Sequence, residues 1–521
     1  MYYKYWFYTS QGIKSTGFPI PIIGKMFALQ NEINQMTEFS EQPIYEYYRK
    51  IFQGEKIPNF FIDFRLAEGT LVVSDPDILQ ELFVTKAKQV DKHYRLKTLF
   101  YDLTGESILF DKTTESQGNK RKRLSVAFYK DKMTQNLIII IKKTFAWVQA
   151  IKKDIKEGNN ERELSKMIND HIMDCILASV FGETDIKQTV QFQVGDKTSE
   201  ISIGVCVGKL FLQLARKMQK PHRIFTKIFD TVYIGKEEKI LQKNLQTYRN
   251  FLQSLIDKRR QQIKDSNYSS TDFLSLLLSD DLFCNDNNLI KDEISTFMLA
   301  STQTTATLIT NLLYYYEYVP GIKQKLRDEI CSIMRPDNAG IQNPTIDQLC
   351  LTPDNWIDKL GYDQLQDSWK YLYLLIQESM RIEPPVRASS LLQVNQQTNI
   401  AGYEIKPDIP ISVHFLLLHT NQDEWQEPDK FIPERFDPES PYFLNRSGKK
   451  RKPQSFSPFL GGRRICLGKT FAENIAKIIV PLIVSEIEFK FKRPIHYERK
   501  PKKGLSTEIN VPIILSNLKF E

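Results

Sequence analysis

From residue 119 to residue 319, the hydrophobic positions recur mostly at the spacing of an α-helix. Polar breaks near residues 156–160, 182–185, 266–271 and 284–288 divide this stretch into several predicted helices. A later helical pattern ends at Arg381, shortly before Pro384 and Pro385, which cannot continue a helix. The pattern therefore predicts a body built mainly of helices.

Shorter segments carry other patterns. Residues 59–83 predict a strand, a turn, a second strand and then a helix capped by Asp75. Residues 44–52 predict a short helix, residues 398–405 and 411–418 predict short strands, and a helix is expected after Cys466. The tail from residue 488 alternates as a β-hairpin does. We find no internal repeat and no long linker, so we expect a mainly α fold with a small β-rich lobe.

Composition narrows the class of protein. Among 521 residues, 41% are hydrophobic and 12% aromatic, which is typical of a globular chain. The net charge of +8 comes without a dense basic tract interleaved with aromatics, so nucleic acid is not expected as a partner. The six cysteines form no CxxC pair, which argues against a zinc knuckle and a disulfide scaffold and favours a reducing compartment.

No segment approaches the roughly 20 consecutive apolar residues that span a bilayer, and no secretory signal is evident. The Pro/Gly cluster at residues 17–24 resembles an entry hinge. We therefore expect a soluble or peripherally bound chain.

One cysteine stands in an unusual setting, the stretch FSPFLGGRRICLGKTFAE at residues 456–473. Cys466 lies at or near the start of a predicted helix, where backbone N–H groups and the helix dipole favour an anion. Helix N-termini and neighbouring arginines lower thiol pKa values, which favours a thiolate here. The alternative is a buried structural cysteine beside a glycine-rich turn.

The stretch meets the pattern FxxGxRxCxG in full, through Phe459, Gly462, Arg464, Cys466 and Gly468. This resembles the haem-binding loop of the cytochrome P450 family, the haem-thiolate monooxygenases. The resemblance implies that Cys466 is the axial iron ligand, which favours O–O cleavage. It also implies that Arg464 holds a haem propionate and that Phe459 covers the sulfur.

Two further motifs stand in the family's order. Glu378 and Arg381 lie three residues apart on one helix face, a spacing that is otherwise typical of a solvated pair. Downstream, Pro433, Arg435 and Phe436 resemble the family's PxRF segment. The resemblance implies a buried charge network of Glu378, Arg381 and Arg435 that acts structurally and takes no part in catalysis.

The segment FMLASTQTTATLIT at residues 297–310 resembles the family's oxygen-binding helix. Thr304 stands in the place of the proton-delivering threonine, and mid-helix hydroxyls are expected to loosen the helix locally. Gln303 replaces the usual acid and cannot donate a proton at neutral pH, although it can hold a water that relays one. Ser301 replaces a glycine. The alternative is an ordinary buried helix rich in threonine.

Two basic segments remain. SQGNKRKRLSVAF resembles the family's WxxxR helix, with Gln117 in the tryptophan place and Arg121 as the candidate for the second propionate. The alternative is a solvated basic face. The run at residues 449–452 is either a solvated loop or a surface that steers an acidic electron donor.

Taken together, the resemblance implies an N-terminal segment (residues 1–30) with the hinge and no complete membrane anchor, and one haem domain (residues 31–521). It implies haem b, electrons from NADPH through a flavoprotein reductase, a small apolar substrate and insertion of one oxygen atom. Its substrate-determining segments are residues 92–116 and 203–234. Localisation at the cytosolic face of the endoplasmic reticulum membrane or in the cytoplasm, and a peripheral membrane contact, are compatible with the chain.

Two alternatives remain open. One is a hydroperoxide isomerase or dehydratase, or a peroxide-using enzyme, on the same fold. The other is a haem-binding sensor without turnover.

Overall fold

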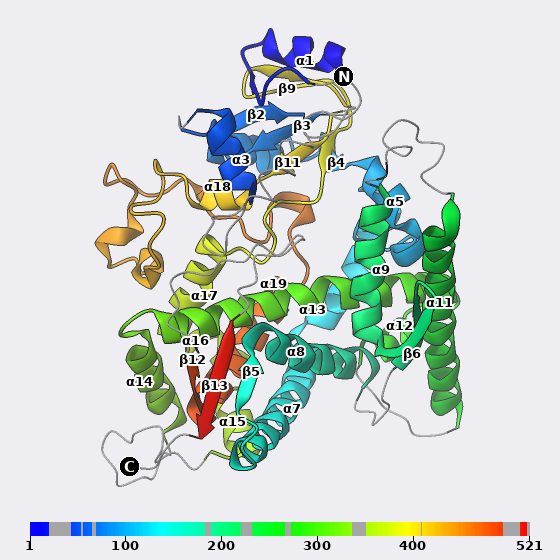
Figure 1. Cartoon of the computed structure of the whole chain (residues 1–521), viewed down its shortest axis with the longest axis vertical. Coiled ribbons are helices and arrows are strands. Elements are labelled where there is room, and N and C mark those ends of the chain that lie inside the picture. Colours follow the sequence, from blue (N-terminus) through cyan, green and yellow to red (C-terminus); the bar gives the residue numbers. More distant parts are fainter. Residues whose placement is uncertain are drawn as a thin grey trace.

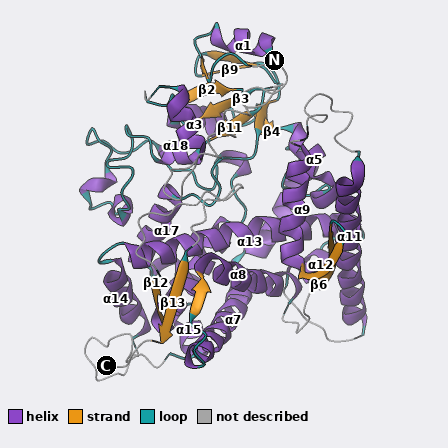
Figure 2. Ribbon diagram, viewed as in Figure 1, coloured by secondary structure: helices purple, strands orange, loops and turns teal. Residues whose placement is uncertain are grey.

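The computed structural model describes residues 1–19, 43–53, 56–64, 69–182, 189–218, 220, 232–265, 272–335, 351–407, 409–492 and 511–517. Within these residues, a helical body and a β-rich lobe lie at opposite ends of the long axis of the molecule (Figures 1 and 2). This is the mainly α fold with a small β-rich lobe that the sequence predicts. Both parts contribute to the candidate site.

The helical body is organised around α13 (Asn287–Tyr318), whose residues 305–316 are all buried. A helix that is buried on every side belongs at the centre of a core. It packs against α8 (Leu164–Phe181), α9 (Ile203–Met218), α17 (Lys370–Ile382) and α19 (Lys469–Glu486). The remaining helices of the body are α5 (Tyr94–Thr104), α6 (Glu115–Leu124), α7 (Lys130–Lys156), α11 (Gly235–Lys264), α12 (Phe273–Ser279), α14 (Ile322–Met334), α15 (Pro353–Lys359) and α16 (Tyr362–Asp367).

The β-rich lobe contains a six-stranded sheet in the order β1-β2-β3-β11-β8-β4. Its strands are β1 (Lys14–Ser15), β2 (Phe60–Asp63), β3 (Thr70–Val73), β11 (Ile411–Val413), β8 (Leu392–Val394) and β4 (Val90–Lys92). β2 and β3 are antiparallel, and β11 runs parallel to β3. β4 pairs with β8 from about 300 residues away, with Lys92 opposite Leu392. The sheet thus joins the N-terminal quarter of the chain to the C-terminal third.

The N-terminal segment packs onto this lobe. In and after α1 (Tyr2–Thr9), the side chains of Tyr8 and Ile13 are buried in the core of the lobe, and β1 pairs with β2. None of the described helices is long and apolar enough to cross a membrane. The expected domain boundary at residue 30 and most of the expected hinge lie outside the described residues, so they stay predictions.

Several predicted elements are confirmed. Strands β2 and β3 are followed by α4 (Pro76–Gln80), and the Asp75 carboxylate caps this helix by accepting from the N–H groups of Asp77 and Ile78. The short helix is α3 (Pro43–Ile51), and the tail pairs β12 (Ile487–Phe491) with β13 (Pro512–Asn517) as antiparallel strands. The predicted break at residues 266–271 lies outside the described residues.

Two predictions were wrong in part. Residues 411–418 are not one strand, because the chain turns into α18 (Phe415–His419) after β11, and the His414 ring accepts from the N–H of Leu417 as a helix cap. The stretch predicted as helical also contains a hairpin, β6 (Thr189–Val194) and β7 (Lys197–Ser202). Its signal was the alternation that buries Val190 and Phe192, followed by a turn at Gly195, whose φ is +59°.

The remaining short elements are the hairpin β9 (Thr398–Ile400) and β10 (Tyr403–Ile405), and β5 (Glu161–Glu163), which pairs with β13. Both strands of the predicted segment 398–405 are therefore present. Single turns at η1 (Glu81–Thr85), η2 (Ser125–Phe128), η5 (Pro433–Phe436), η6 (Pro441–Phe443), η7 (Pro453–Ser455) and η8 (Gly462–Arg464) complete the described elements.

Candidate haem site

The loop that carries Cys466 is closed on itself. The N–H of Cys466 donates to the carbonyl of Phe459 at 3.0 Å, and the N–H of Ile465 donates to the carbonyl of Gly462 at 3.3 Å. Gly462 has a φ of +62°, and a Cβ on it would lie 2.2 Å from the carbonyl oxygen of Phe83. Only glycine fits such a position without strain. The loop is therefore fixed against the β-rich lobe.

The other glycine of the motif has a different setting. Gly468 is the N-cap of α19. Its φ of −87° is accessible to any residue, and a Cβ added to it would have no atom within 4 Å. Contacts within the chain therefore do not require glycine at this position. Its N–H donates to the Cys466 sulfur. The predicted place of the cysteine, just before a helix, is confirmed.

The charge state of Cys466 differs from the expectation. Cys466 as a residue is exposed at the surface, yet the pKa of its thiol is raised, mainly by burial of the sulfur among neighbouring protein atoms. The Gly468 N–H and the charges of Arg121 and Lys92 offset part of the rise. The expectation of a net lowered pKa was therefore wrong for the chain by itself. A coordinating thiol is deprotonated outright by a metal ion, so a cation at the sulfur would reverse this balance.

Three cations gather around Cys466. Burial lowers the pKa of Arg121, of Arg464 and of Lys92, which reaches about 7. The charge of Arg464 lowers that of Lys92 further, while Asp91 raises it in part. Positive charge that is buried without full compensation is costly. The cluster therefore fits a ligand that carries carboxylates.

A neutral donor adds to this fit. Gln117 lies one turn before Arg121 on α6, is 2% exposed, and its Nε2 has no hydrogen-bond partner among the described residues. Buried donors are normally paired, so a lone one points to an acceptor that the chain does not itself supply. The cation cluster and this amide are together the residues that fit the propionates of a haem.

The two predicted propionate arginines lie beside the cysteine loop. Arg121 donates to the carbonyl of Ile465. Arg464 donates to the carbonyls of Asp111 at 2.9 Å and Ile108 at 3.2 Å. Their positions agree with the expectation, while their part in binding haem stays a prediction.

Sequence reasoning missed Lys92 as a member of this cluster. It is 7% exposed and donates to the hydroxyl of Ser390. No local motif marks this lysine, because it reaches the site only through the pairing of β4 with β8.

The predicted charge network is present and buried. Glu378 accepts from Arg381 through two hydrogen bonds of 2.7 and 2.8 Å and from Nε of Arg435 at 3.2 Å, and all three side chains are 0% exposed. The N–H of Ile432 adds a fourth bond to Glu378 at 2.8 Å. The two guanidinium groups also donate to five backbone carbonyls, those of His419, Gln426, Glu427, Pro428 and Lys430.

The threonine-rich segment of α13 makes the expected bonds from hydroxyl groups to carbonyls of the same helix. The hydroxyls of Thr304 and Thr302 donate to carbonyls one turn earlier, of Ala300 at 2.6 Å and Met298 at 2.8 Å. The helix is continuous from Asn287 to Tyr318, and the expected local loosening stays a prediction. Back-bonding through hydroxyls is compatible with an intact helix when the carbonyl keeps its own N–H partner. The side chain of Gln303 is exposed and donates to Thr307 at 3.4 Å.

This segment lies over the helix that follows Cys466. The ring of Phe297 on α13 is 5.9 Å from that of Phe471 on α19. Thr304 lies two turns farther along α13. The structure thus brings the helix with the candidate threonine and the helix that begins after the candidate ligand into one packed unit.

Comparison with known proteins agrees with this site. A sequence model of the family "Cytochrome P450" matches residues 16–514. The chain is 33% identical to rat "Cytochrome P450 4A12" over 42% of the chain and 37% of that protein, and 27% identical to mouse "Cytochrome P450 4A10" over 50% and 47%. It thus spans less than half the length of these rodent relatives. It is 25% identical to "Tabersonine 16-hydroxylase 1" of Catharanthus roseus over 87% of the chain and 83% of that protein.

A solved structure shows the same fold. The chain superposes on a cytochrome P450 haem domain with a TM-score of 0.69 and 17% identity, over 97% of this chain and 98% of the other. With the family match over nearly the whole length and a site that fits the carboxylates of the cofactor, this chain belongs to the cytochrome P450 family, and haem is its cofactor.

Proposed function

We propose that this protein is a haem-thiolate monooxygenase that inserts one atom of dioxygen into a small apolar substrate. The observation that carries the proposal is the Cys466 sulfur, which accepts from the N–H of Gly468 at the start of α19 within a cluster of three cations. When bound, haem supplies the iron chemistry that activates dioxygen. The hydroxylase name of the relative from Catharanthus roseus supports the same class of reaction.

The residues of the chain then have distinct parts. Cys466 ligates the iron, and Phe459 shields the sulfur. Arg464, Arg121 and Lys92 hold the carboxylates, since charge-assisted hydrogen bonds are the strong ones. Thr304 would hand on a proton from α13. Its hydroxyl keeps a free lone pair while it donates to Ala300, so water supplied along α13 can renew the proton.

Electrons come from NADPH through a flavoprotein reductase in this proposal. Lys449 and Lys450 are exposed and offer a basic surface to an acidic donor. The rest of the basic run is engaged: Lys452 pairs with Asp77 at 2.6 Å, and Arg451 donates to the carbonyl of Arg435 at 2.6 Å. The proposed location is the cytosolic face of the endoplasmic reticulum membrane or the cytoplasm, and a peripheral contact to lipid is compatible with either.

Isotope labelling tests the proposal. The purified protein is given NADPH, a flavoprotein reductase, ¹⁸O-labelled dioxygen and a panel of alkylbenzenes, coumarin ethers and medium-chain carboxylic acids. We expect products that carry one labelled oxygen and need the reductase. Turnover of an organic hydroperoxide without reductase, together with no product from reductase, NADPH and dioxygen, would instead establish the isomerase or peroxide-using alternative. Spectral shifts without any product would identify a sensor.

Thr304→Val is expected to lower the rate of product formation by about 100-fold, the low end of what a positioned proton donor contributes. Thr304→Ser keeps the hydroxyl and most of the rate. Thr302→Val is the matched control, because Thr302 makes the same type of bond on the same helix and is 8% exposed. Product and NADPH consumption are measured together. Equal losses in the two valine variants would contradict the role of Thr304.

Lys92→Met is expected to speed haem loss about tenfold or more, since a hydrogen bond from a charged group contributes about 1.5–3 kcal/mol. Lys92→Arg keeps the charge and most of the retention. Lys88→Met, four residues earlier and exposed, is the control. Transfer of haem to excess apomyoglobin is followed by absorbance. Unchanged transfer in Lys92→Met would remove this lysine from the carboxylate cluster.

A further inference from the structure

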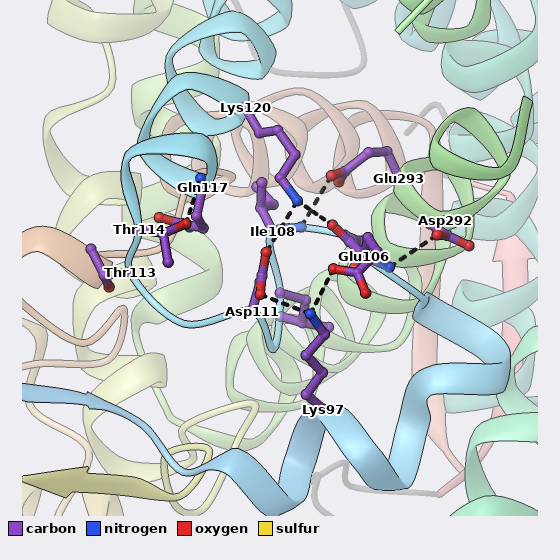
Figure 3. A network of polar contacts seen from close by, with 12 residues as sticks. Lys97, Glu106, Ile108, Asp111, Thr113, Thr114, Gln117, Lys120, Asp292 and Glu293 are labelled. Atoms are coloured by element: carbon purple, nitrogen blue, oxygen red, sulfur yellow. Dashed lines mark hydrogen bonds and ion pairs between the residues drawn. The ribbon is translucent and has the colours of Figure 1, made fainter. Parts of the chain in front are cut away.

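Residues 105–113 connect α5 to α6 and are bonded on two sides, to α13 and to the cysteine loop. Figure 3 shows the side that faces α13. On the side of α13, the N–H of Glu106 donates to Asp292 and the N–H of Ile108 donates to Glu293, both at 3.0 Å. The hydroxyl of Thr296 donates to that of Ser107 at 2.6 Å. One face of α13 thus holds three successive residues of this loop.

At Gly105 the backbone of the loop lies directly against the carboxylate of Asp292 on α13. Gly105 has a φ of +44°, and a Cβ on it would lie 1.9 Å from the nearer Asp292 oxygen. Asp292 in turn accepts from Arg249 of α11 at 2.8 Å. The first residue of the loop therefore has no room for a side chain, and its carboxylate partner is held in place from behind.

Two lysines tie the middle of the loop together. Lys120 of α6 is 5% exposed and donates to the carbonyl of Glu106 and to Asp111 at 3.1 Å. Lys97 of α5 pairs with Asp111 at 3.0 Å and with Glu106 at 2.6 Å. Figure 3 shows these side chains converging on the loop from both helices.

On the opposite side the loop holds an arginine of the haem site. The carbonyls of Asp111 and Ile108 accept from Nη2 of Arg464, and the hydroxyl of Thr113 lies 3.4 Å from its Nη1. The peptide units that meet at Ile108 therefore face both ways, with the N–H toward Glu293 and the carbonyl toward Arg464.

We propose that Glu293 is a positioning residue: by binding the N–H of Ile108 it fixes the carbonyls that aim Arg464, and so couples α13 to the haem carboxylate site. The proposal rests on the proposed function in one respect, that Arg464 holds a haem carboxylate. Glu293 acts on the haem site through the loop, by way of the Ile108 N–H.

The charge of Glu293 gives this coupling a pH dependence. Its pKa is raised to about 8, mainly by burial, with Lys120 and the Ile108 N–H as partial offsets. In the opened loop its pKa returns to the ordinary 4.5. Between pH 4.5 and about 8, Glu293 therefore holds a proton in the closed loop and releases it in the open loop. Closure of the loop is strongest below pH 4.5 and weakens as the pH rises toward 8.

Three ionisable groups act directly on Glu293: Lys120 on α6, Asp111 on the loop and Asp292 on α13 itself. Behind them, Lys97 on α5 pairs with Asp111 and Glu106, and Arg249 on α11 pairs with Asp292. The pKa of Asp292 is also raised, mainly by burial, so Asp292 acts in the same direction as Glu293. The pKa of Asp111 is lowered by its two lysines against the effect of burial, so its contribution is lost only at more acidic pH.

Amide hydrogen exchange of the purified holoprotein tests the proposal at residues 105–113. Glu293→Ala is expected to lower protection there at least about tenfold, whereas Glu293→Gln keeps an acceptor oxygen and most of the protection. If opening releases one proton, protection in the wild type falls by about tenfold per pH unit between pH 5 and 8. In Glu293→Gln this proton is absent, so the fall in protection per pH unit is smaller by about a factor of ten. Haem transfer to apomyoglobin speeds up in Glu293→Ala.

Glu329→Gln is the matched control, because this carboxyl also has a raised pKa and accepts two backbone N–H groups, at the start of α17. It should leave exchange at residues 105–113 and haem transfer unchanged. The same pH slope in wild type and Glu293→Gln, or unchanged protection in Glu293→Ala, would overturn the proposal. A wild type without haem would refute the proposed function, while the exchange data would still decide whether Glu293 holds the loop.

Discussion

Glu378→Ala is expected to lower the free energy of unfolding by about 3–5 kcal/mol, the cost of breaking a buried ion pair from one side. The carboxylate of Glu378 is 0% exposed and accepts four hydrogen bonds, from Arg381, Arg435 and the N–H of Ile432. Its removal leaves two guanidinium groups buried without a counter-charge. Burial and the charge of Arg381 already lower the pKa of Arg435, and Glu378 offsets this.

Denaturant unfolding of the holoprotein, followed by circular dichroism, measures the loss. Glu434→Ala is the control on the neighbouring segment, because Glu434 pairs with Lys325 at 2.8 Å on the surface and such pairs contribute less than about 1 kcal/mol. Glu378→Gln should fall between wild type and Glu378→Ala, since the amide keeps one acceptor. Equal stability of Glu378→Ala and Glu434→Ala would show that the buried network is dispensable for the fold.

Cys466→Ala is expected to abolish product formation and to weaken haem binding more than about 100-fold, because even partners of metal ligands contribute 10–100-fold to metal affinity. No other cysteine of the described residues shares the closed loop, the Gly468 N–H and the cation cluster. The ratio of haem to protein after desalting and the turnover of a coumarin ether measure the two effects.

Cys284→Ala provides the matched control. Cys284 is half-buried, and its sulfur contacts the carbonyl of Asp281 at 3.9 Å in a loop before α13. Its replacement removes a thiol outside the candidate site. Full haem content and turnover in Cys466→Ala would mean that another residue ligates the iron.

Local patterns predicted the parts of the site that depend on short spacing. The cysteine loop is closed by bonds within eight residues, and Glu378 meets Arg381 one helical turn away, so both are visible in the sequence. Arg435 could be added because its motif stands in the family's order. The strands at residues 60–73 and the Asp75 cap follow from alternation and from a side chain that binds its own helix.

The remaining parts depend on pairing across the chain, which spacing does not encode. Lys92 reaches the site because β4 pairs with β8 some 300 residues later, and Glu293 meets Ile108 from a helix 185 residues away. The sequence also could not predict that the pKa of Cys466 is raised, because this shift depends on how many protein atoms surround the sulfur. A cap such as His414 is hard to foresee when the same residues have strand-like composition.

The carbon monoxide difference spectrum of the reduced, purified protein, recorded beside that of Cys466→Ala, tests the central claim most directly. We predict the red-shifted Soret band for which the family is named, and its loss in the variant, because the shift would depend on the Cys466 thiolate as iron ligand. A protein without haem, or the same band in both proteins, would contradict the assignment of Cys466 as the iron ligand and with it the proposed function.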